Sequence, residues 1–237
     1  MPSSAVENKE PVYFNDQLAA DLRGFGILGI FSILLIIFGG NLFIGGIAFI
    51  PLGGLFALVW TLRSKTLWSE LGYKQPKGWI GTILVGLVFG IGFKLFMKTT
   101  VMPLLGANAI NPTYHFLSGN KAMLPMALIF MMVAGLSEET VFRGFLFERF
   151  GKLFGSSPSS KALIAVISAG LFGLGHLTDQ GVAGFEQAAI VGLIFGMIYA
   201  KTGNIWMLIL AHVAFDITAV AIIIWNLESD VAHFFFQ

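Results

Sequence analysis

The sequence predicts an all-α, polytopic membrane protein, a bundle of about seven transmembrane helices. Of its 237 residues, 56% are hydrophobic and 11% are charged, whereas an ordinary soluble domain has roughly 45–50% apolar and about 25% charged residues. Apolar runs recur along nearly the whole chain and leave no polar block large enough for a separate globular unit. We therefore expect a single transmembrane domain over residues 23–237.

The first 22 residues differ from the rest of the chain. They mix Glu, Asp, Lys and Pro and lack the order of a basic region followed by an apolar one that marks a signal peptide. We expect a short solvated arm. Its composition is also compatible with an interfacial helix within this arm.

The next segment predicts a helical hairpin. A membrane helix needs about 20 mostly apolar residues, so the charge-free interval between Arg23 and Arg63 is too long for one span. Gly and Asn at positions 39–41, followed by Gly45 and Gly46, mark the expected turn, because these residues weaken a helix and accept turn geometry.

Residues 63–79 separate this hairpin from the remaining spans. Four basic residues with Trp68, Tyr73 and Trp79 give the composition of an interfacial segment, since aromatic rings favour the level of the lipid headgroups. Further spans are expected at about 80–93, 121–147, 162–177, 182–200 and 205–227. These segments give seven transmembrane spans in total, and a count of six or eight is also compatible with the sequence.

Two pairs of glycines are spaced by four residues, Gly86 with Gly90 and Gly192 with Gly196. This spacing lets helix backbones approach closely. Chance spacing is the alternative in a chain with 29 glycines.

The basic residues predict the orientation in the cell membrane. Seven spans place the lysines and arginines of one side at positions 9, 23, 63, 65, 74, 77, 149, 152, 161 and 201. Lysine and arginine concentrate in cytoplasmic loops, so we expect this side to be cytoplasmic and the carboxyl terminus to face outward.

Composition also excludes some functions. A nucleic-acid-binding protein needs a stripe of basic side chains that replaces the counterions at the phosphates. With a net charge of +1 the chain shows no such stripe. Without cysteine there is no disulfide, no thiolate nucleophile and no zinc site with Cys ligands.

A few polar residues interrupt the apolar spans. A charged residue at the bilayer centre costs about 2.5–3.5 kcal/mol on insertion scales, so each needs a reason. The candidate site residues are Glu138, Glu139, Arg143, His176, His212 and Asp216.

Helical spacing predicts how these residues pair. Glu139 and Arg143 are four residues apart and can form an ion pair on one face, whereas Glu138 points about 100° away. A buried carboxylate without a neutralising partner is a candidate general base. His212 and Asp216 repeat the four-residue spacing on a later span, as do Phe172 and His176.

Counted at about 1.5 Å per residue from the proposed cytoplasmic boundaries, the three sites lie at roughly 15, 22 and 16 Å depth. They can meet if the helix that carries His176 begins a few residues after Lys161. The alternative is a buried polar network that only joins helices. Other polar residues are weaker candidates. We expect Lys94 and Lys98 to extend toward an interface, and His115 and His233 to be structural or incidental. Asp179 and Glu186 are expected to be solvated beside a loop on the side opposite the proposed opening.

Three motifs in order carry a family resemblance. They read EETVFR at 138–143, FGLGH at 172–176 and HVAFD at 212–216. This order resembles the CPBP family of intramembrane proteases, which includes type II CAAX prenyl endopeptidases and bacteriocin-processing or immunity proteins. The resemblance covers about residues 121–225, the expected catalytic helices.

The resemblance implies a role for each residue. Glu138 would activate a water for attack on a peptide carbonyl, His176 would help to hold that water, and Glu139 with Arg143 would orient the site.

His212 and Asp216 match the positions that stabilise the developing oxyanion, where hydrogen-bond donors lower the barrier. The prenyl endopeptidases carry Asn at the second position. An ionised Asp216 cannot donate a hydrogen bond, so it would have to be protonated, orient His212 or ligate a metal.

The candidate residues are compatible with a zinc site and with a reaction that uses no metal. The family was first described as metalloproteases, and Glu138, His176 and His212 would form a catalytic zinc set with an open position for water. The chain has no HExxH motif, and the glutamate and histidine mechanism needs no metal. We favour the reaction without a cofactor, and zinc is the alternative.

The leading hypothesis is an intramembrane endopeptidase that cuts a peptide or protein at the bilayer, with the active site opening toward the cytoplasmic side. The substrate could be prenylated or a leader peptide, since both would need an apolar pocket. The alternative is a catalytically silent membrane scaffold or bacteriocin-immunity-type binding protein. A third hypothesis, a proton-coupled transporter, expects repeat symmetry or broken helices, and the sequence shows no clear case of either.

Overall fold

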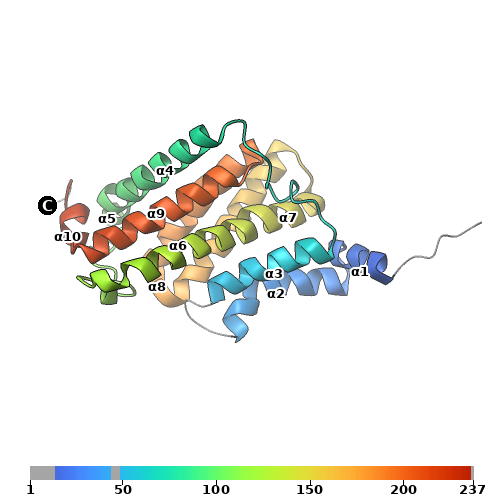
Figure 1. Ribbon diagram of the computed structural model, residues 1–237, viewed down its shortest axis with the longest axis horizontal. Coiled ribbons are helices and arrows are strands. Elements are labelled where there is room, and N and C mark those ends of the chain that lie inside the picture. Colours follow the sequence, from blue (N-terminus) through green and yellow to red (C-terminus); the bar gives the residue numbers. More distant parts are fainter. Residues whose placement is uncertain (1–13, 44–48, 236–237) are drawn as a thin grey trace, which may run out of the picture.

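The computed structural model describes residues 14–43 and 49–235, and within these ranges it contains helices and no strand (Figure 1). The predicted all-α class is confirmed. The α-helices, in chain order, are α1 (Phe14–Arg23), α2 (Ile27–Phe43), α3 (Phe49–Arg63), α4 (Trp79–Phe96), α5 (Met102–Leu104), α6 (Leu124–Glu139), α7 (Leu146–Phe154), α8 (Pro158–Thr202), α9 (Trp206–Ile224) and α10 (Glu228–Ala232).

Short π- and 3-10-helical segments join some of these helices. The π-helical segment η1 (Met97–Val101) connects α4 to α5, and η4 (Thr140–Phe145) connects α6 to α7. The 3-10 helices are η2 (His115–Leu117) and η3 (Lys121–Met123).

Four helical stretches of the described chain are long and apolar enough to cross a membrane: Trp79–Leu104, Lys121–Phe154, Pro158–Thr202 and Trp206–Ile224. A bent pair near the amino terminus, Gln17–Arg23 with Ile27–Phe38, makes a fifth if it is counted as one span. The chain is a membrane protein, and the count of seven stays a prediction.

The amino-terminal segment is helical before the predicted domain begins. Residues 14–22 of the expected solvated arm belong to α1, which meets α2 at an angle of 60°. The expected turn at 39–41 is wrong, because α2 continues through Phe43. Gly45 and Gly46 lie outside the described residues.

The stretch that begins with α4 extends farther than predicted. The apolar run was expected to end near residue 93, but the helix continues through η1 and α5 to Leu104. Lys94 and Lys98 therefore lie inside a helix. The α4 backbone packs closely on α9, since a Cβ on Gly90 would lie 2.1 Å from the Ala211 carbonyl oxygen.

Helix α8 folds back on itself. The expected loop between spans 162–177 and 182–200 is reduced to Gly181, whose φ of +64° breaks the helix. Such a φ favours glycine because it has no Cβ. The two arms pack together, with Gly192 against Ala169 and Gly196 against Ala165. Both predicted close-packing glycine pairs are thus confirmed.

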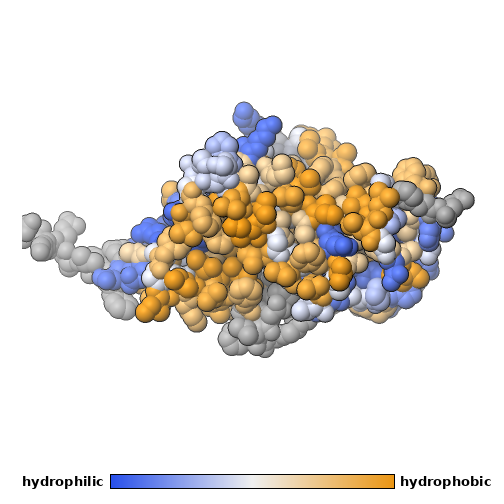
Figure 2. All heavy atoms as spheres, turned by 180° about the vertical axis from the view of Figure 1, so that it is seen from behind, coloured by the Kyte–Doolittle hydropathy of each residue, from blue (hydrophilic) through white to orange (hydrophobic). Residues whose placement is uncertain are grey.

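The outer surface is rich in apolar side chains. Figure 2 shows one face of the molecule covered largely by hydrophobic residues, with hydrophilic ones mainly toward its edges. Exposed examples are Ile27 at 89%, Ile80 at 77% and Val88 at 71% of their surface. Such continuous exposure is unusual for a soluble protein and is expected of a surface that contacts lipid.

Candidate active site

The candidate site lies where α6, η4, α8 and α9 meet. Glu138 and Glu139 occupy the last turn of α6, and Arg143 lies in η4. His212 comes from α9, directly beside the position where α9 packs on α4. Single π-helical turns occur frequently at functional sites, and η4 begins at the residue that follows the paired glutamates.

Glu139 lies at the centre of the cluster. Its Oε1 atom is 2.9 Å from Nη1 of Arg143 and 2.7 Å from Nδ1 of His212. Both Glu139 and Arg143 are buried, with exposed fractions of 0% and 1%. The predicted Glu139–Arg143 ion pair is confirmed, and the contact with His212 adds a partner that helical spacing could not predict.

Aromatic rings and a backbone carbonyl hold the Arg143 guanidinium. Its carbon Cζ lies 5.0 Å from the ring centre of Phe172 and 5.4 Å from that of Phe195. Its Nη2 donates a long hydrogen bond of 3.5 Å to the carbonyl of Gly192. Cation–π contacts of this kind stabilise a desolvated cation, so Arg143 is fixed from both arms of α8.

The imidazole of His212 lies between the two glutamates. Its Nε2 atom is 3.2 Å from Oε2 of Glu138 and 3.6 Å from Oδ2 of Asp216. Glu138 was expected to lack a neutralising partner, and this expectation is wrong, because α9 brings His212 to it. The distance to Asp216 exceeds that of a hydrogen bond, so Glu139, and not Asp216, orients the ring.

His176 approaches the cluster from α8. Its Nδ1 atom lies 2.9 Å from the carbonyl oxygen of Phe172, which can only accept a hydrogen bond. Nδ1 must therefore carry the proton, and in the neutral ring Nε2 is left as an acceptor. The Phe172 ring packs edge-on against His176 at 4.7 Å and against His212 at 5.9 Å, so it separates the two imidazoles.

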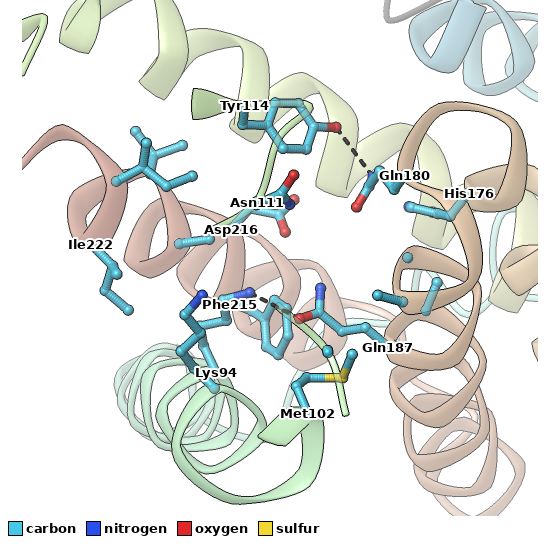
Figure 3. Close-up of a pocket in the computed structure, with 18 of the residues that line it drawn as sticks. Lys94, Met102, Asn111, Tyr114, His176, Gln180, Gln187, Phe215, Asp216 and Ile222 are labelled. Atoms are coloured by element: carbon cyan, nitrogen blue, oxygen red, sulfur yellow. Dashed lines mark hydrogen bonds between the residues drawn. The ribbon is translucent and has the colours of Figure 1, made fainter. Parts of the chain in front are cut away.

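A cavity of about 400 Å³ adjoins this cluster, and four of the six predicted site residues line it: Glu138, His176, His212 and Asp216. Further polar residues that were not predicted for the site also line the cavity. They are Lys98 and five residues labelled in Figure 3: Lys94, Asn111, Tyr114, Gln180 and Gln187. Tyr114 accepts a hydrogen bond from Gln180 at 3.2 Å, which ties the segment before η2 to the bend of α8.

The expected position of Lys94 is wrong. It was expected to extend to an interface, but only 7% of its surface is exposed, and its Nζ donates to Oε1 of Gln187 at 3.1 Å. The sequence signal was present, because a lysine within an apolar helix costs about as much as a carboxylate there.

A smaller cavity of about 120 Å³ lies on the other side of Glu138 and His176. Its lining is mostly apolar, with Ile36, Val141 and Phe142 among its residues, and comes from α2, α3, α6, η4, α8 and the segment before η2. Glu138 and His176 line both cavities. The larger one, called the polar cavity below, has more polar groups in its lining than the smaller one, although most of its lining surface is apolar too.

The larger cavity lies toward one end of the bundle. Its lining includes Leu117 of η2 and Ala232 of α10, at the end where Figure 1 places α5 and α10. The basic segment after α3 lies at the opposite end, beside the start of α9. If the cavity opens at the end where it lies, the expected opening toward the cytoplasm and the expected cytoplasmic position of the basic segment cannot both hold, and the orientation stays a prediction.

The basic segment itself supports the site from behind. Tyr73 reaches Thr140 of η4, with 2.5 Å between their hydroxyl oxygens, and its ring packs on Trp206 at 5.3 Å. Burial raises the pKa of Tyr73, which keeps the phenol neutral. The composition of residues 63–79 predicted Tyr73 at the level of the lipid headgroups, and its contact with Thr140, the residue after Glu139, was not predicted.

The residues considered for zinc do not form a ligand set in this arrangement. His212 turns both ring nitrogens toward carboxylates, Nδ1 to Glu139 and Nε2 to Glu138. In the described part of the chain, no group of three or more His, Asp and Glu side chains has a geometry that could hold a metal ion.

Part of the chain is similar to a known protein family. Residues 120–218 match the family model described as type II CAAX prenyl endopeptidase Rce1-like. The family resemblance predicted from the three motifs is confirmed over this segment. It contains all six candidate site residues.

One curated relative is the uncharacterized protein YyaK of Bacillus subtilis strain 168, which is 34% identical over 97 residues. The match covers 39% of this chain and 31% of that protein's length. No solved structure matches the chain at a significant level.

Proposed function

We propose that this protein is an intramembrane endopeptidase that hydrolyses a peptide bond in a membrane-associated peptide or protein. The observation that carries the proposal is the position of His212, with one carboxylate at each ring nitrogen, at the wall of a cavity of about 400 Å³. The Rce1-like match over residues 120–218 supports the same reaction class.

Glu138 is the general base in this proposal. Its carboxylate lines both cavities and can take a proton from a water as the water oxygen attacks the peptide carbonyl. The same proton then passes to the leaving amine when the tetrahedral intermediate collapses. A positioned acid–base group contributes about 10²- to 10⁴-fold to a rate.

His212 supplies the hydrogen-bond donor for the oxyanion. Glu139 accepts from Nδ1 of His212 and pairs with Arg143, so the ring cannot rotate freely. In its imidazolium form the ring also donates from Nε2, the nitrogen that faces Glu138. Asp216 adds a negative charge near this nitrogen and lines the same cavity.

His176 holds the attacking water. Because Nδ1 donates to Phe172, the unprotonated Nε2 can accept a hydrogen bond from that water. Two acceptors, Nε2 of His176 and the Glu138 carboxylate, then orient its lone pair toward the carbonyl. None of these steps uses a metal.

The two cavities suit a peptide with an apolar group beside the scissile bond. The apolar cavity of about 120 Å³ would take that group, and the polar cavity would take the chain on the other side of the bond. A leader peptide and a prenylated peptide both meet this description, and both are candidate substrates.

The test uses Glu138→Gln, which keeps the shape of the side chain and removes the base. We expect cleavage of a membrane peptide library by the purified protein to fall about 10²- to 10⁴-fold, while the protein folds as wild type. Glu186→Gln is the matched control, since Glu186 lines neither cavity. Chelators should leave activity intact.

The substrate can be identified by comparing the proteomes of cells that contain the wild-type protein and cells that contain Glu138→Gln. It is the membrane-associated peptide that stays uncut only in cells with the variant. Full biological activity in Glu138→Gln would instead support a scaffold or immunity protein. Loss of activity together with one equivalent of zinc on chelation would contradict the metal-free mechanism.

A further inference from the structure

Two lysines form one wall of the polar cavity. Lys94 and Lys98 are four residues apart on the continuous helix from Trp79 to Leu104, and both line the cavity. The Lys94 ammonium donates to Gln187 and lies 4.7 Å from the ring centre of Phe215. Figure 3 shows Lys94, Gln187 and Phe215 together at the cavity.

Neither lysine has a carboxylate partner at contact distance. Lys98 donates to the backbone carbonyl of Ala109, and within residues 14–43 and 49–235 no carboxylate oxygen lies within 4.0 Å of either ammonium. Buried charges in proteins are ordinarily paired. These two cations have only neutral acceptors.

The carboxylates that share the cavity have other contacts. Glu228 accepts from the backbone N–H of Asn111 at 2.8 Å and faces His115 at 3.1 Å. Asp216 faces His212. Lys94 lies near Asp216 and Glu228 and interacts with both electrostatically. No carboxylate is in contact with either ammonium in the described residues, so a carboxylate that enters the cavity can contact both lysines.

We propose that Lys94 and Lys98 form a subsite for a carboxylate of the peptide substrate and so determine specificity. This inference rests on the proposed endopeptidase function. The cavity volume of about 400 Å³ is within the range of small-ligand pockets, about 300–1,000 Å³, so it suits a short charged segment. A charge-assisted hydrogen bond from ammonium to carboxylate is about twice as strong as a neutral one.

The test measures peptide binding separately from cleavage. The probes are one fluorescent apolar heptapeptide in three forms: a free terminal carboxylate, a terminal carboxamide, and the carboxamide with one internal Asp. Binding is measured to full-length Glu138→Gln protein in zwitterionic nanodiscs. We expect at least one carboxylate form to bind about tenfold or more tightly than the neutral form, and the form preferred shows whether the carboxylate is terminal or internal.

The second step removes the charge. Lys98→Met should abolish the preference and leave the affinity of the neutral peptide unchanged, whereas Lys98→Arg should keep it. Lys121→Met is the control, because Lys121 is exposed and does not line the cavity. Lys94→Arg, which keeps the charge next to Phe215, should also retain the preference.

Several results would overturn the subsite. Equal affinity for all three peptides would contradict it. An equal loss of affinity for all three peptides in Lys98→Met would also contradict it, because it would indicate a purely structural lysine. Loss of the preference in nanodiscs of phosphatidylglycerol would assign the lysines to a lipid phosphate. The two proposals fail separately: lysine-dependent binding without cleavage contradicts the protease, and cleavage without the preference contradicts the subsite.

Discussion

At the scale of single residues, Glu139 has more partners than any sequence pattern indicated. The spacing of Glu139 and Arg143 predicted their ion pair because residues four apart share a helix face. The contact between Glu139 and His212 joins positions 73 residues apart and depends on how α6 packs on α9. One carboxylate oxygen thus receives a guanidinium and an imidazole at once.

This arrangement predicts a large effect for Arg143→Met. Methionine has a side chain of similar length but no charge, so Glu139 would stay buried without its cation. Removing one partner of a buried ion pair lowers the free energy of unfolding by about 3–5 kcal/mol. Unfolding of the purified protein in a mild detergent measures the loss.

Lys152→Met is the matched control for that experiment. Lys152 is about 40% exposed and pairs with Glu70 and with the buried Glu148. Glu148 keeps Arg149 as a partner when Lys152 is replaced, so the loss should be about 1 kcal/mol or less. Equal losses for Arg143→Met and Lys152→Met would show that the buried pair contributes no more than a surface one.

At the scale of elements, the span that forms α9 was predicted closely, although His212 and Asp216 interrupt its apolar run. Helix α9 begins and ends within three residues of the predicted span. The stretch through α4 was predicted too short, because Lys94 and Lys98 looked like a boundary when both in fact face a cavity. The π-helical turn η4 has no sequence signature that was recognised.

Close packing of α4 on α9 predicts contrasting effects for two neighbouring glycines. A Cβ on Gly90 would lie 2.1 Å from the Ala211 carbonyl oxygen, so the helices must separate. We expect Gly90→Ala to destabilise the protein by about 1–3 kcal/mol, as for an overpacked core. Because Ala211 precedes His212, activity should also fall.

Gly92→Ala is the control on the same helix. A Cβ on Gly92 has no described atom within 4 Å, and alanine favours a helix over glycine by about 1 kcal/mol. Thermal unfolding of the two variants should therefore move in opposite directions. A similar loss in both would mean that glycine is needed for flexibility and not for close packing.

At the scale of the whole molecule, the polar cavity and the basic segment lie at opposite ends of the bundle. Lysines and arginines concentrate in cytoplasmic loops, which favours a cytoplasmic basic segment. By this criterion the cavity is closer to the outer face, and substrate would approach from there.

Cysteine labelling tests the orientation directly, because the chain has no cysteine. Lys77 is exposed in the basic segment, and Asn120 is exposed near the cavity end. With a membrane-impermeant maleimide on intact cells, we expect Asn120→Cys to be labelled, and Lys77→Cys to react only after permeabilisation. The reverse pattern would place the cavity at the cytoplasmic face and contradict the charge criterion.

The sequence by itself determined the helical membrane class, the family resemblance and the Glu139–Arg143 pair, because each depends on composition or on spacing within one helix. The tertiary structure alone decided that His212 lies between Glu138 and Glu139, that Lys94 faces the cavity, and which end of the bundle the cavity adjoins. These features depend on the rotation and depth of each helix relative to its neighbours. Contacts such as that of Gly90 with Ala211 set those positions, and local sequence pattern does not encode them.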